Sequence, residues 1–181
     1  MVKLAAGSTY TPIATTTLGS AAASYTFSSI PSTYTDLIIV CSVSTTSGSA
    51  GIAMQVGNGS VDTGSNYSGT YLSGTNYGGS QIAKSVRETS VAKIYISEWA
   101  GVALSSPSPV IIHFQNYANT TTYKTVLIRF NTQDNASGYN EVNAGVGLWR
   151  STSAINTISI QTTASTFTAG STFTLFGIAS A

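Results

Sequence analysis

Nine short runs of β-branched and aromatic residues, separated by Gly, Ser, Thr, Asn and Pro, constrain the fold of this chain more than any other feature. In one run Val126, Ile128 and Phe130 fall on the same side of an extended strand, and no segment between the runs keeps the period of a helix. The runs are 23–30, 36–44, 51–57, 91–97, 109–117, 123–131, 144–150, 155–162 and 172–179. Nine strands without a helix predict an all-β domain, either a sandwich or a barrel.

The apolar residues that share one face of each run are predicted to form the core. Ile158 and Ile160 share one face of their run, and Phe173 and Leu175 share one face of theirs. The run 36–44 is apolar on both faces, which predicts a central strand covered on both sides. One N-terminal strand and eight core strands favour a single jelly-roll-like antiparallel β-sandwich, with another Greek-key sandwich as the alternative.

Two segments depart from this pattern. Residues 1–22 are small and Thr-rich and contain Pro12, so we expect an extended N-terminal arm in front of a sandwich domain over 23–181. Residues 58–90 form a long Tyr/Gly/Ser segment without a strong core pattern. Because a structureless loop of that length is unusual in a compact domain, we expect it to contain a hairpin or short strand lying over the sandwich.

Charge and apolar content exclude several classes of partner. The net charge is +1 and charged residues make up 7% of the chain, which leaves no field to hold nucleic acid or an anionic membrane. No apolar run is long enough to span a bilayer, and MVKLAAGSTY lacks the apolar centre of a signal peptide. A chain made in the cytoplasm whose surface is solvated by hydroxyls suggests a subunit of a virus particle.

Residues for catalysis or metal binding are few. His113 is the single histidine, no acidic pair is marked by its spacing, and the pair Glu98 and Trp99 is better explained by packing than by sugar cleavage. Asp62 and Asp134 lie in loops without a nearby acidic partner for a calcium site. The lone cysteine, Cys41, excludes an internal disulfide and suits a buried thiol. We therefore expect no enzyme activity, no cofactor and no metal.

Five segments, taken in order, resemble a known family. They are ASYTFSSIPSTYTDLIIV, NYSGTYLSG, FQNYANTTTYKTVL, GVGLWRSTSAINTISI and FTAGSTFTLFGI. Together they are similar to small virion structural proteins of tailed bacteriophages, frequent in marine phages, and the resemblance covers about Ala14 to Ile178. It implies a β-rich particle protein without a known activity, and it transfers no catalytic residue.

The most specific of these segments also has a physical interpretation. In GVGLWRSTSAINTISI, Gly145 and Gly147 allow Trp149 or a neighbouring strand to approach closely, and the polar STSAIN makes a hairpin or a sandwich corner. In SSIPSTYTDLIIV, Pro31 ends one strand, and Tyr34 is expected to cap the bend with its hydroxyl bonded to the backbone.

The expected function follows from the fold and the resemblance. We expect a capsid decoration or cement protein on the outer surface of the phage particle, forming a homotrimer and binding the phage capsid protein. A chain of 181 residues leaves no room for a fibre shaft. The alternative is a tail-fibre or receptor-binding tip that contacts host glycan, and a glycan-degrading enzyme is the weakest hypothesis.

Uncharged segments rich in tyrosine are typical of recognition surfaces, because tyrosine gives large contact area at low entropic cost. The arm and the 58–90 segment are therefore the expected contact regions. The residues predicted to lie in these contacts are Tyr67, Tyr71, Tyr77, Tyr10 and Pro12.

Overall fold

The computed structural model describes residues 9–47, 50–77, 79–97, 106–133 and 140–179. Strands make up 63% of the structure, and the described residues contain no helix. Accordingly, no helix in this part of the chain is long and apolar enough to cross a membrane.

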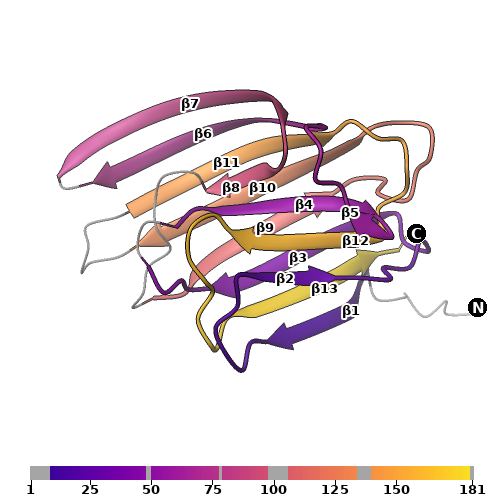
Figure 1. The fold of residues 1–181 in the computed structure, drawn as a ribbon, viewed down its shortest axis with the longest axis horizontal. Coiled ribbons are helices and arrows are strands. Elements are labelled where there is room, and N and C mark those ends of the chain that lie inside the picture. The colour runs from indigo at the N-terminus through magenta and orange to yellow at the C-terminus, as the bar shows by residue number, and fades with distance from the viewer. Residues whose placement is uncertain (1–8, 48–49, 78, 98–105, 134–139, 180–181) are drawn as a thin grey trace, which may run out of the picture.

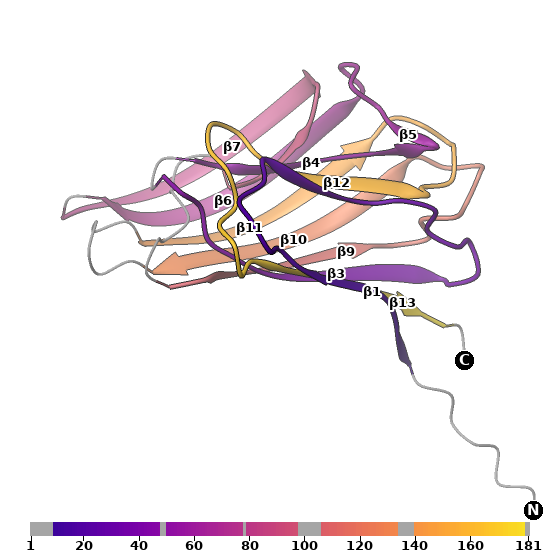
Figure 2. The same ribbon diagram turned by 60° about the horizontal axis from the view of Figure 1, so that its bottom comes forward.

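Thirteen strands build two antiparallel sheets that pack face to face (Figures 1 and 2). The larger sheet has the order β1-β13-β3-β9-β10-β11-β6-β7, and the smaller has the order β2-β12-β4-β5 with β8 paired to β4. The strands are β1 (Tyr10–Thr17), β2 (Ser24–Phe27), β3 (Asp36–Val43), β4 (Ile52–Asn58), β5 (Ser60–Val61), β6 (Tyr67–Tyr77), β7 (Ser80–Val91), β8 (Ile94–Ser97), β9 (Ser108–Phe114), β10 (Lys124–Gln133), β11 (Asn140–Trp149), β12 (Thr157–Thr162) and β13 (Thr172–Ile178). Each of the nine predicted runs overlaps one of these strands, which confirms the all-β antiparallel sandwich.

The core lies between the two sheets, and the alternation of side chains along the strands predicts it correctly. Val126, Ile128 and Phe130 of β10 are buried together. Ile158 and Ile160 of β12 meet them in the same cluster from the smaller sheet. Each strand thus contributes every second residue to one apolar layer, as the pleat of a strand requires.

Strand β3 differs from its expected environment. Leu37 and Ile39 are fully buried, but Ile38 is only half-buried and Val40 is 39% exposed. The smaller sheet covers one side of β3, and no described element covers the other. The prediction of a strand covered on both faces is therefore wrong for the isolated chain.

The extended arm expected over 1–22 is also different in the structure. Residues Tyr10–Thr17 form β1, which pairs with β13 and closes one edge of the larger sheet. The pairing shifts between Pro12 and Ala14, where proline has no amide hydrogen to donate to the ladder. Residues 1–8 lie outside the described part of the chain.

The 58–90 segment forms regular structure in place of the expected loop. After the short β5, strands β6 and β7 make one long hairpin that adds two strands to the larger sheet beyond β11. In both views this hairpin reaches past the ends of β4 and β12 (Figures 1 and 2). Small residues such as Gly69 and Ser73 stand on the same inward side of β6 as Tyr71, so the apolar alternation is interrupted and the strand period is hard to recognise in the sequence.

The segment GLWRSTSAIN is a corner that carries the chain from β11 in one sheet to β12 in the other. A methyl group at Gly147 would lie 2.7 Å from Val126 Cγ1 and 2.8 Å from Ile94 of β8, so the expected close approach of a neighbouring strand is present. Trp149 is buried, and its indole Nε1–H donates to Asp62 Oδ2 at 2.8 Å. The corner therefore ties β11 to the loop that precedes β6.

Asp62 is the centre of that loop, and its charge should make the stability depend on pH. Partial burial raises the pKa of its carboxyl, but hydrogen bonds from Trp149, Asn66 and the Gly64 amide outweigh burial and bring the pKa below the ordinary value. A lowered folded pKa gives a stabilisation that is present above the unfolded pKa of about 3.9 and is lost as the pH falls through the folded value. We expect Asp62→Asn to lower the melting temperature at pH 7 and the difference from wild type to shrink toward pH 3. A difference that is independent of pH would contradict this role.

The tyrosine that caps the bend before β3 is not the predicted one. Tyr34 is half-buried, and its ring covers the backbone of Gly177. The hydroxyl of the fully buried Tyr117 donates to the Pro31 carbonyl and accepts from the Tyr34 amide at 3.4 Å. Tyr117 lies 86 residues from Pro31, so only the tertiary structure brings them together.

Candidate functional site

The outer side of the larger sheet is the most unusual surface of the molecule. We call it the open face and define it by the outward side chains of β3, β9, β10, β11 and β6. Six large apolar side chains on these five strands are exposed, namely Val40 (39%), Ile111 (42%), Leu127 (48%), Val146 (50%), Leu72 (63%) and Val142 (63%).

Strand register places these side chains next to one another. In one row across the sheet Val40 pairs with Ile111, Ile111 with Arg129, Arg129 with Ala144, and Ala144 with Leu72. Side chains directly opposite on neighbouring strands lie about 5 Å apart. The row is therefore largely apolar, with Arg129 between the apolar pairs on either side of it.

A second row runs beside the first. Ile38 pairs with His113, His113 with Leu127, Leu127 with Val146, and Val146 with Thr70. Soluble monomers rarely expose apolar surface that is contiguous over several strands, and such patches usually mark contact sites.

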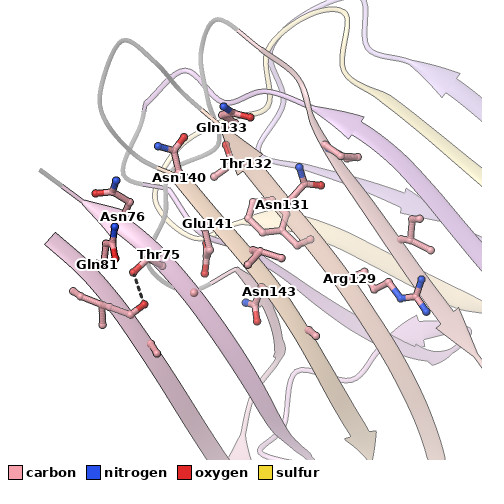
Figure 3. Close-up of a pocket in the computed structure, with 18 residues that line it drawn as sticks. Thr75, Asn76, Gln81, Arg129, Asn131, Thr132, Gln133, Asn140, Glu141 and Asn143 are labelled. Atoms are coloured by element: carbon pink, nitrogen blue, oxygen red, sulfur yellow. Dashed lines mark hydrogen bonds between the residues drawn. The ribbon is translucent and has the colours of Figure 1, made fainter. Parts of the chain in front are cut away.

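The open face is hollowed toward the β6–β7 turn. The hollow has a volume of about 1240 Å³ and is lined by residues of β7, β6, β11, β10 and β9 (Figure 3). Gly74, Ala83, Val142 and Ala144 contribute small or apolar surface. Its polar lining comes largely from side-chain amides, namely Asn76, Gln81, Asn131, Gln133 and Asn140. Figure 3 shows Asn76, Gln133 and Asn140 gathered at one end, apart from Arg129.

Charges on the open face are few. Arg129 lies near its centre, and its guanidinium makes no hydrogen bond or ion pair with any described residue. Asp36 is engaged at the margin, where Oδ2 lies 2.9 Å from His113 Nε2 and Oδ1 accepts from the Asn116 amide at 2.9 Å. The face therefore offers apolar contact, amides and, near its centre, a cation without a partner among the described residues.

The tyrosines predicted for contacts lie elsewhere. Tyr67 and Tyr71 are buried inside the sandwich, so they are not available to a partner. The Tyr67 hydroxyl donates to the backbone oxygens of Val56 and Asp62 and accepts from the Val56 amide at 3.0 Å. The side chain of Tyr77 lies outside the described part of the structure.

Tyr10 and Pro12 are exposed on the edge strand β1. The Tyr10 ring packs edge-on against Phe176, with the ring centroids 6.3 Å apart. Of the four predicted contact residues whose side chains the structure describes, these two keep a surface that a partner is able to reach, at the far edge of the larger sheet from the hollow.

The candidates for chemistry are not assembled into a reactive site in the described residues. His113 has a carboxylate beside it in Asp36, and its cross-strand neighbours are Ile38 and Leu127. Burial raises the pKa of the Cys41 thiol to about 12, which keeps it neutral at ordinary pH. Glu98, Trp99 and Asp134 lie outside the described residues.

No group of three or more His, Cys, Asp or Glu side chains among the described residues is arranged to hold a metal ion. Asp62, considered for calcium, uses both carboxylate oxygens in hydrogen bonds to the surrounding loop. Its observed role in this structure is to organise that loop.

One signal for the open face was present in the sequence. The run 36–44 is apolar on both faces, a pattern that predicts burial within the chain. The same pattern also describes a strand whose second face is covered by another molecule. Leu127 and Val146 gave no such signal, because single apolar residues on outward faces are common.

Comparisons with known proteins do not identify the chain. No protein-family model matches it, and no curated protein matches it. Among solved structures, a toad ovary galectin in complex with thio-digalactose is similar over 77% of this chain and 99% of its own, with 12% sequence identity and a TM-score of 0.28. A likeness of this level carries no argument about function.

Proposed function

We propose that the chain is a structural protein of a tailed-bacteriophage particle that coats the outside of the capsid shell and acts by binding, not by catalysis. The observation that carries the proposal is the open face, a broad and largely apolar exposed surface on a chain that has few charges. Interface centres are depleted in charged residues in the same way. The resemblance of the sequence to phage virion proteins supplies the setting.

The position of the open face supports a role in coating. It belongs to a rigid sheet whose other side is held by the core, so little order has to be gained when it docks. A broad sheet face suits a protein shell, which offers many identical copies of one surface. In the proposed homotrimer, copies of the chain meet through other surfaces.

The coating assay tests the open face with a double variant, Leu127→Ser with Val146→Ser. These residues are cross-strand neighbours, and both are about half exposed. Losing two apolar contacts should weaken docking by about 2–4 kcal/mol, which is roughly 30- to 700-fold in affinity. The measurement is the amount of purified chain bound to particles that lack it, together with the number of copies on each native particle.

Tyr123→Ser is the matched control, since Tyr123 is 53% exposed but lies outside the strands that form the open face. It should coat like the wild type. Normal coating by the double variant, or only a few copies on each particle, would contradict the proposal.

A second candidate function is a receptor-binding tip that contacts host glycan. The observation that favours it is the amide lining of the hollow, because each carboxamide offers both a donor and an acceptor to sugar hydroxyls. Gln81→Ala with Gln133→Ala would then leave coating intact and reduce adsorption of the phage to its host.

A further inference from the structure

We infer that the partner of the open face is a protein surface that is itself apolar and presents one carboxylate to Arg129, and that it is not a second copy docked through the same face. This inference rests on the proposed docking role of the open face and adds the chemistry of the partner.

The side chains around Arg129 are apolar or uncharged. Its cross-strand neighbours are Ile111 and Ala144, and its neighbours on the same side of β10 are Leu127 and Asn131. None of these is an acid, and the guanidinium has no partner among the described residues. When no partner covers the face, water solvates the charged guanidinium of Arg129.

Docking changes the environment of that charge. A partner that covers Ile111 and Leu127 removes water from Arg129 as well, since all three stand on adjoining positions of the same face. A charge that loses its water without gaining a partner costs several kcal/mol. A carboxylate opposite the guanidinium replaces the lost water with two parallel hydrogen bonds.

The other charges on the outer side of the larger sheet also favour a partner that carries acid. Arg87 on β7 is a second exposed cation on the outer side of the larger sheet. Asp36, the acid on the outer side among the described residues, already bonds His113 and Asn116. The outer side of the larger sheet, which includes the open face, therefore carries an excess of positive charge among its described residues, and this favours an apolar partner surface that carries acid.

The charge of Arg129 also disfavours a second copy of the chain as the partner of the open face. Two open faces packed on one another would bring two Arg129 side chains into an interface where the described residues offer no free acid. Arg129 then prevents self-association through this face and leaves it available to a different partner.

Pairing of a partner's strand with an edge of the larger sheet is a less favourable mode of binding. The edge strand β7 carries Lys84, Arg87 and Glu88, and the opposite edge β1 carries Pro12. Charges and proline on edge strands are common protections against pairing with another chain. Within the larger sheet, the face is therefore better suited to a partner than either edge.

A fragment titration tests the carboxylate. Pentanoate and its neutral analogue pentanamide are titrated into the 15N-labelled full chain, and amide shifts of β9 and β10 are followed. We expect pentanoate to bind about fivefold more tightly, the upper end for a partly exposed ion pair. Arg129→Gln should abolish the preference, and Arg87→Gln is the control that keeps it. Equal affinity for the two fragments would overturn the inference.

Sedimentation velocity tests the exclusion of a second copy. The wild type should show no association that depends on the open face, whereas Arg129→Leu should self-associate and Arg129→Leu with Val146→Ser should not. A wild-type dimer that Val146→Ser dissociates, or an Arg129→Leu variant that does not associate, would overturn this part. Both experiments use the chain alone, so their failure is distinguishable from failure of the coating assay.

Discussion

Replacing Phe130 with alanine should lower the free energy of unfolding by about 3–5 kcal/mol, a large share of the roughly 5–15 kcal/mol typical of a domain. Phe130 is 2% exposed on the inner side of β10, between Val110 of β9 and Asn143 of β11. The cavity left by the ring is held open by two hydrogen-bonded neighbours, so it cannot collapse. Chemical denaturation of both proteins measures the difference.

Leu127→Ala is the control for this prediction, because Leu127 lies on the same strand with its side chain on the opposite face and 48% exposed. It should cost less than about 1 kcal/mol, as surface substitutions do. Similar losses for the two variants would mean that the two faces of β10 are equally buried in solution, which contradicts the open face.

Replacing Tyr67 with serine should destabilise the fold by about 3–5 kcal/mol through the lost ring, and by a further 1–3 kcal/mol through unpaired backbone groups. The ring is fully buried, and its hydroxyl lies 2.8 Å from the carbonyl oxygens of Val56 and Asp62. Thermal unfolding followed by circular dichroism should show a variant that is largely unfolded at 37 °C.

Tyr123→Ser removes the same atoms from an exposed site and should melt within a few degrees of the wild type. If Tyr67→Ser were as stable as Tyr123→Ser, the Tyr67 hydroxyl network would not contribute to the fold. Burial also raises the pKa of Tyr67 to about 12, so its hydroxyl remains a hydrogen-bond donor throughout the neutral range.

These two predictions separate the residues that hold the fold from those that meet a partner. Tyr67 and Tyr71 stabilise the sandwich from within. Leu127, Val146 and Arg129 are on the other side of the same sheet and contribute little to its stability by the same reasoning. Their substitution is therefore expected to affect docking while the fold remains intact.

Nine of the strands and the core residues on them follow from the amino-acid sequence alone. Period-two alternation is a local property, so Val126, Ile128 and Phe130 could be placed on one face without knowing their neighbours. The close approach at Gly147 was likewise predicted, because glycine in a strand indicates backbone crowding wherever the neighbour comes from.

What covers each face of the sheet, and whether a tyrosine points inward or outward, depends on contacts between distant parts of the chain. The β6–β7 hairpin is stabilised by pairing with β11, a contact between residues about 70 positions apart that leaves no local pattern. Pairing with β13 likewise makes a strand of residues 10–17, which were expected to form an arm. Sequence alternation shows that a face is apolar but not what covers it, and the open face is defined by the second sheet, which packs on the other side of the larger sheet.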